Sequence, residues 1–272
     1  MFIDGVMLLW FLLTALSVAF VAIDIRRTPE HPVMKWAFVL FTAYSGPIGA
    51  FLYVLGCREP LPGLHEQYVA ARWRQALGST MHCVAGDGIG ILVGAVIGAL
   101  ISLPMGVAVA LEYMLGFAFG WAIFQARFMG DMFGSYARAL KGTFVPELLS
   151  MNCLMGGMMP VASLAFMHNP AAHDPSEPLF WFRMSLALMV GAAFAFPMNW
   201  WLVAHHLKHG MLTVRPKGDT SATPDMKKKM DMAMANGSAL HAPRPAVAVM
   251  TAISFAVLAA GLAVAFAFGG GH

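Results

Sequence analysis

Charged side chains are scarce in this sequence. Aspartate, glutamate, lysine and arginine make up 11% of its 272 residues, whereas 59% of the residues are hydrophobic. A soluble domain carries about 25% charged residues, so this chain has too few to cover a surface that faces water. The composition therefore predicts a protein whose main partner is the lipid bilayer. The net charge of +3 is small and most basic residues fall in expected loops, which argues against nucleic acid as a partner.

Cysteines and catalytic motifs are also few. The three cysteines, Cys57, Cys83 and Cys153, lie far apart and form no C-x-x-C pair, so a disulfide framework is not supported. The sequence has no H-E-x-x-H, G-x-S-x-G or P-loop motif, and its "GDGIG" lies inside an apolar stretch. We therefore predict no catalytic residues, and an enzyme is the less favoured class. The first stretch lacks a basic n-region and a cleavage site, which predicts a retained anchor rather than a signal peptide.

What the chain does have is long apolar stretches. A helix that spans a bilayer needs about 20 mostly apolar residues, which predicts an all-α, polytopic transmembrane helix bundle. Pro104 in the short "SLPM" turn ends one helix before the next begins. Residues 62–78 predict a short amphipathic helix at the membrane interface. About seven spans are expected, at residues 2–23, 33–56, 81–103, 105–127, 144–167, 178–204 and 246–268.

These elements suggest four regions and an orientation. The regions are an N-terminal anchor helix and loop (1–34), a core membrane domain (35–211), a Met/Lys-rich loop (212–245) and a C-terminal transmembrane helix (246–272). With seven spans, most basic residues fall on one side if the N-terminus is cytoplasmic. Arg26 and Arg27 directly after the first span oppose that assignment. We expect a multi-pass protein with a cytoplasmic N-terminus.

Ionisable residues inside the spans predict a functional site, because such residues are costly in a membrane. Four of them fall at similar depth on two helices together with a methionine, and these imidazole, thiol, carboxylate and thioether groups suit a metal ion, with copper favoured. This candidate metal set is His82, Cys83, Asp87, Glu147 and Met151. Accessory candidates are Met155, Asn199, His205, His209 and Glu112, of which Glu112 lies toward the other face.

Each of these features also has a simpler interpretation. The methionines are equally suited to filling gaps in an apolar core, and the histidines at the membrane edge to contact with water. The loop "DMKKKMDMAMANGSALH" resembles a metal-collecting segment, but its lysines also suit anionic lipid headgroups. Glycines four residues apart predict close helix packing across the "SLPM" turn. They are Gly86, Gly90, Gly94 and Gly98 on one helix and Gly116 and Gly120 on the next.

Several motifs occur in an order that resembles a known family. They are "AYSGPIGAFLYVLG", "STMHCVAGDGIGILVGAVIG", "EYMLGFAFGWAIFQ", "VPELLSMNCLM" and "FPMNWWLVAHHLKHGM", within residues 35–211. Together they resemble a bacterial membrane-protein family known as domain of unknown function 4396. The matching residues are His82, Cys83, Gly86, Glu147, Met151, Pro197, Asn199, Trp200 and Trp201. Asp87 departs from the pattern, since a second cysteine is expected there, and this widens the metals that the site would accept. The resemblance implies a bacterial inner-membrane protein without a settled activity.

Three functions remain open at this point. The first is transport or handling of a metal ion through the polar intramembrane site. The second is a non-catalytic scaffold or assembly subunit that binds other membrane subunits through its glycine faces. The third is a proton-coupled carrier of a small molecule, in which Asp87 or Glu147 exchanges protons.

Overall fold

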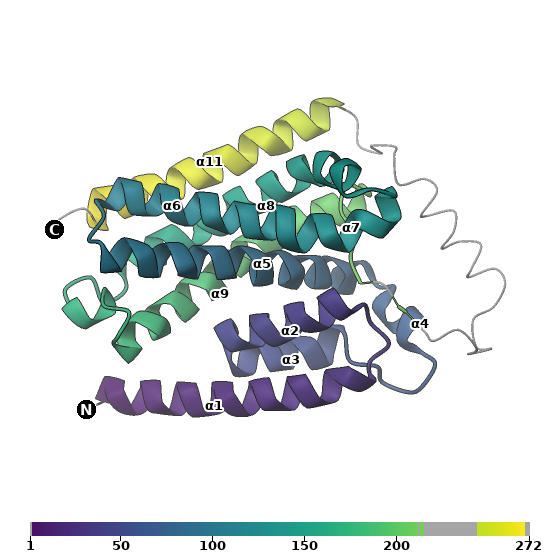
Figure 1. Ribbon diagram of the computed structural model, residues 1–272, viewed down its shortest axis with the longest axis horizontal. Coiled ribbons are helices and arrows are strands. Elements are labelled where there is room, and N and C mark those ends of the chain that lie inside the picture. The colour runs from purple at the N-terminus through teal and green to yellow at the C-terminus, as the bar shows by residue number, and fades with distance from the viewer. Residues whose placement is uncertain (1, 212, 215–243, 270–272) are drawn as a thin grey trace.

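The structure is a bundle of long helices that run in roughly one common direction (Figure 1). The computed structural model describes residues 2–211, 213, 214 and 244–269. Within these residues the only β pairing is an isolated bridge between Glu30 and Thr213, so the all-α prediction is confirmed. The α-helices are α1 (Phe2–Asp24), α2 (Pro32–Ser45), α3 (Pro47–Gly56), α4 (His65–Val69), α5 (Arg72–Leu100), α6 (Met105–Ala118), α7 (Ala126–Phe133), α8 (Tyr136–Leu164), α9 (Pro178–Ala204) and α11 (Arg244–Gly269). Shorter elements are η1 (Ile25–Arg27), the π-helix η2 (Phe119–Gln125) and η3 (Pro170–Ala172).

Five helical runs of the described chain are long and apolar enough to cross a membrane, so the expected count of seven is not confirmed. They are Ile3–Arg27, Arg72–Leu100, Met105–Gly130, Pro178–Ala204 and Pro245–Gly269. Exposed leucines along α1, such as Leu8, Leu12 and Leu16, suit contact with lipid. Helix α8 has 29 residues but is less apolar, because it carries Glu147 and Asn152. Both side chains are fully buried against other helices.

The expected span 33–56 is wrong, because the structure divides it into two helices. The break is at Gly46, whose φ of 57° favours glycine, and Pro47 then opens α3. Helices α2 and α3 pack as a hairpin, with the rings of Phe38 and Tyr53 5.7 Å apart. This α2–α3 hairpin enters and leaves at the same end of the bundle (Figure 1). It therefore does not cross from one end to the other.

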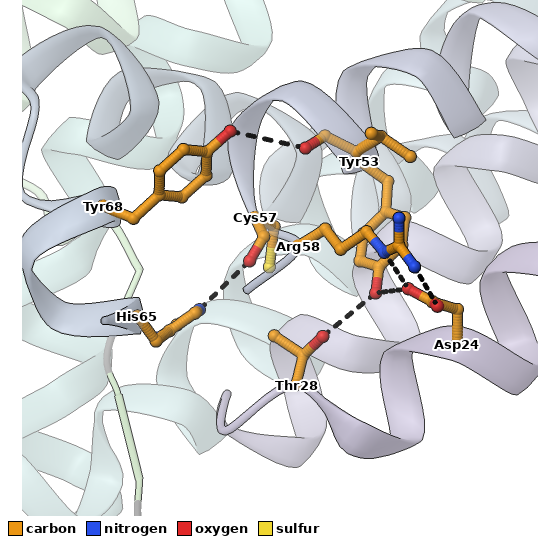
Figure 2. A network of polar contacts seen from close by, with 8 residues as sticks. Asp24, Thr28, Tyr53, Cys57, Arg58, His65 and Tyr68 are labelled. Atoms are coloured by element: carbon orange, nitrogen blue, oxygen red, sulfur yellow. Dashed lines mark hydrogen bonds and ion pairs between the residues drawn. The ribbon is translucent and has the colours of Figure 1, made fainter. Parts of the chain in front are cut away.

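A polar network joins the base of the hairpin to the end of α1 (Figure 2). Arg58 donates from Nε and Nη2 to the Asp24 carboxylate at 2.9 and 3.0 Å. The Tyr53 hydroxyl donates to Asp24 at 2.8 Å and lies 3.0 Å from the Thr28 hydroxyl. These contacts place residues before and after the hairpin at one level, which fixes both of its ends on one side.

Other expected boundaries also shift. The interfacial helix expected at 62–78 is wrong in extent, since α4 covers only His65–Val69 and α5 already begins at Arg72. The helix expected from 144 begins at Tyr136, where the Ser135 hydroxyl accepts from Arg138 N–H at 3.3 Å and caps it. Residues 215–243 of the expected Met/Lys-rich loop lie outside the described residues.

Candidate functional site

Four ionisable side chains meet inside the bundle, where helices α5 and α8 approach each other. Cys83 and Asp87 come from α5, Glu147 comes from α8, and Lys208 comes from the segment after α9. Lys208 Nζ lies 2.8 Å from Glu147 Oε2, and both side chains are at most 1% exposed. The ammonium also donates to Cys83 Sγ, and the thiol donates to Glu147 Oε2 at 3.4 Å. We call Cys83, Asp87, Glu147 and Lys208 the ionic cluster.

Asp87 is the member of the cluster whose hydrogen-bonding capacity is unmet. It is 0% exposed, and no donor of the described protein reaches either carboxylate oxygen or Glu147 Oε1. Asp87 Oδ1 and Glu147 Oε1 nevertheless lie close together, because a single Cβ atom built on Gly120 would meet both of them. Two ionised carboxylates are both acceptors, so a hydrogen bond between them requires one proton.

The charge balance of the cluster leads to the same requirement. Two carboxylates and one ammonium leave one net negative charge in a region without water-exposed atoms. Burying unpaired charge is strongly unfavourable. One added proton on Asp87 or Glu147 makes the cluster neutral and supplies the missing donor, so the arrangement is suited to hold a single proton.

Small residues on the neighbouring helix make room for these carboxyls. A Cβ atom built on Gly120 would overlap Asp87 Oδ1 and would lie 3.0 Å from Glu147 Oε1. Gly120 belongs to the π-helix η2, and such segments occur often at functional sites. Along the same interface, Gly90 lies against the backbone of Leu115, and Gly94 lies against Glu112. The glycines are thus used for packing between α5 and α6 inside this chain.

The segment that carries Lys208 closes one end of the bundle over the cluster. Residues 205–211 turn back from α9, and Met211 packs on Gly78 of α5. Gln75 Nε2 donates to Met211 O at 3.3 Å, and the Thr213 hydroxyl lies 2.6 Å from His65 Nδ1. Burial alone lowers the pKa of Lys208, but Cys83 and Glu147 raise it, and the net direction is upward. The groups around Lys208 therefore favour its charged form.

The other residues singled out from the sequence are not members of the ionic cluster. His82 is buried beside it, with its ring 5.1 Å from that of Phe128. Met151 and Met155 are fully buried in the apolar core of the bundle. Asn199 is buried and donates to the Ser150 hydroxyl at 2.9 Å, which joins α9 to α8.

His205 and His209 are four residues apart in the sequence, but α9 ends at Ala204, before both of them. The His205 ring instead lies 4.6 Å from that of Trp201, and its Nδ1 lies 2.9 Å from Trp201 O. Because the chain turns at His206, where φ is 56°, the four-residue spacing no longer places the two histidines together.

The structure does not assemble the expected metal set as a metal site. Across residues 2–211, 213, 214 and 244–269, no group of three or more His, Cys, Asp and Glu side chains could hold a metal ion. The cation beside Cys83 and Glu147 is Lys208 itself. Two of the five expected ligands, Cys83 and Glu147, thus contact an internal ammonium.

A cavity of about 840 Å³ opens at the other end of the bundle. It lies beside the α5–α6 turn and the loop that precedes α9, at the end where α1 begins (Figure 1). Glu112 of α6 and Arg183 of α9 are among its lining residues. On α5, its lining residue Ala95 is eight residues from Asp87, which is about 12 Å along the helix axis. The cavity and the cluster therefore follow one another along the same helices.

Two functional candidates were missed from the sequence. Lys208 follows the expected span 178–204, and nothing in "HHLKHG" indicates that the chain returns into the bundle. Arg183 is not among the residues singled out from the sequence, and the structure buries it to 7% exposure. A lone arginine inside an apolar helix was the available signal for it.

Exposed apolar helices around a buried ionic cluster and a mostly apolar cavity define a polytopic α-helical membrane protein. The chain belongs to the family described as Domain of unknown function (DUF4396), whose model matches residues 72–208, about half of the chain. All four cluster residues lie within that range. No curated protein and no solved structure shows a significant match.

Proposed function

We propose that this membrane protein is a proton-coupled carrier of a small polar molecule. The observation that supports this most directly is the buried Asp87–Glu147 pair, which has one ammonium for two carboxyl groups and requires one proton to be neutral. Ionisable groups buried in membrane helices often serve as proton relays. The proton is the coupling ion, and the cavity at the other end is the solute site.

The coupling follows from the charges. With a proton on Asp87, the cluster is neutral and Lys208 pairs with Glu147. When Asp87 releases its proton to water, the second carboxylate competes with Glu147 for Lys208. Because Lys208 belongs to the segment that closes one end, a change in its pairing is transmitted to that closure. Protonation and access to the two sides are thereby linked, as alternating access requires.

Two alternatives lose their original support. A copper carrier needs free soft ligands, but the Cys83 thiol is hydrogen-bonded to Lys208 and Glu147. A scaffold was suggested by glycine faces, but Gly86, Gly90 and Gly94 are covered by the protein's own α6–η2 run.

Purified protein in liposomes with an imposed proton gradient tests the proposal. The probes are radiolabelled amino acids and small carboxylates, each supplied outside. We expect at least one probe to accumulate against its own gradient and Asp87→Asn to abolish that accumulation, because asparagine cannot release a proton.

The matched control is Asp174→Asn, since Asp174 is exposed in the loop before α9. It should retain accumulation within about twofold. The carrier proposal is wrong if the folded wild-type protein accumulates none of the probes. It is also wrong if the Asp87→Asn variant still accumulates a probe against its gradient.

A further inference from the structure

Arg183 is an unusually placed cation in the wall of the cavity. It lies near the start of α9 and is 7% exposed, so its guanidinium is held among apolar helices. Its Nη1 lies 3.0 Å from His173 Nδ1, but Nε has no hydrogen-bond partner in the described protein. A buried guanidinium with an unused N–H is costly. Arg183 is nevertheless among the residues that line the cavity, so its guanidinium is suited to pair with an anionic group that enters there.

Glu112 supplies the opposite charge in the same cavity. It lines the space from α6, as Arg183 does from α9. No salt bridge within 4.0 Å joins Glu112 and Arg183 in the described chain, so the two cavity-lining charges are not paired directly. A molecule with one negative and one positive group would satisfy both.

The rest of the lining limits what lies between those two groups. Most of it is apolar, including Val109, Met159, Phe180 and Met184. Arg183 and Glu112 leave the site without net charge, which disfavours a simple anion or a simple cation. The volume of about 840 Å³ falls in the range of small-molecule sites, which is roughly 300–1,000 Å³.

We propose that this cavity binds a small zwitterion with an apolar side chain, such as a hydrophobic α-amino acid. The carboxylate pairs with the Arg183 guanidinium, the ammonium pairs with Glu112, and the side chain lies against the methionine and phenylalanine residues. This assignment names the solute class of the proposed carrier, so its role in transport rests on that proposed function. Binding of the zwitterion can be measured without proton movement.

Calorimetric titration of the full-length protein in detergent tests the assignment without transport. The probe is L-leucine, compared with leucinamide, which lacks the carboxylate, and 4-methylpentanoate, which lacks the ammonium. We expect L-leucine to bind and each analogue to bind at least tenfold more weakly. Equal binding of an analogue, or no binding of L-leucine, overturns the proposal.

Variants separate binding from folding. Arg183→Gln and Glu112→Gln should each weaken L-leucine binding at least tenfold, and Arg183→Lys should weaken it less than Arg183→Gln. The matched control is Arg138→Gln, because Arg138 is exposed at the opposite end. Circular dichroism and gel filtration establish that each variant is folded. Unchanged binding in folded Arg183→Gln contradicts the site.

The two proposals fail separately. If L-leucine binds but Asp87→Asn still accumulates solute with the proton gradient, the zwitterion site stands and the coupling role of Asp87 falls. If Asp87-dependent accumulation occurs only for probes that are not zwitterions, the carrier stands and the assigned solute class falls.

Discussion

Lys208 brings a positive charge from a loop into the centre of the bundle, where it compensates Glu147. The sequence predicted the acceptor side of this site, since His82, Cys83, Asp87 and Glu147 stand out as polar residues in apolar helices. It did not predict the donor, because Lys208 follows the helix end and its direction depends on the turn at His206. A local sequence pattern identifies ionisable residues that are unfavourable to bury. Their partners depend on where a distant segment, here the one after α9, packs in the fold.

Removing one partner of this ion pair should destabilise the protein more than removing both. We expect Lys208→Met to lower the free energy of unfolding by about 3–5 kcal/mol, because it leaves the buried Glu147 without a counter-ion. Adding Glu147→Gln should recover part of that loss. Equilibrium unfolding in mixed micelles measures both variants.

Lys141→Met is the control, since Lys141 is exposed on the same helix as Glu147. It should change the free energy of unfolding by no more than about 0.5 kcal/mol. Equal losses in Lys141→Met and Lys208→Met would show that the cluster does not stabilise the fold.

Among the helices, close approach distinguishes the α5–α6 pair. A Cβ atom on Gly90 would overlap the Leu115 carbonyl, which is backbone and cannot move aside like a flexible side chain. The four-residue glycine spacing predicted such a contact across the "SLPM" turn. The break in 33–56 was not predicted, although "SGP" contains its cause. The span 33–56 was predicted from the length of its apolar stretch. That length does not reveal that Gly46, near its midpoint, has a positive φ and ends the first helix.

Gly90→Ala should therefore destabilise the protein by about 1–3 kcal/mol, because overpacking forces α5 and α6 apart. Gly130→Ala is the matched control, as a Cβ atom there meets no atom within 4 Å. Alanine favours helix, so that variant should be neutral or more stable by up to about 1 kcal/mol. Thermal melting in detergent compares them, and similar melting temperatures would contradict the close packing.

For the molecule as a whole, the hairpin changes how charge is distributed between the two ends. Because α2 and α3 return to the same end, basic residues before and after them gather there. At that end lie Arg26, Arg27, Lys35, Arg58, Arg72, Arg74, Arg127, Arg138, Lys141 and Lys208. Among described residues, the other end has Arg183 and the acidic Asp174 and Glu177. The objection raised by Arg26 and Arg27 disappears, and the basic end becomes the expected cytoplasmic end.

The start of α1 is consequently expected on the non-cytoplasmic side, opposite to the orientation that seven spans suggested. Fusions of alkaline phosphatase, which is active only outside the cytoplasm, measure this. We expect activity for fusions within the 174–177 loop and none for fusions after residues 28 and 60. If one of the fusions after residues 28 and 60 is active and the other is inactive, residues 33–56 cross the membrane and the hairpin assignment is wrong.

Lys208 is both the counter-ion of Glu147 and part of the segment packed over the cluster. Water cannot reach Asp87 from that end unless the segment lifts, and lifting withdraws the ammonium from the carboxyls. In the proposed carrier, the side chain that balances the charge is therefore also the one that limits proton leakage across the membrane.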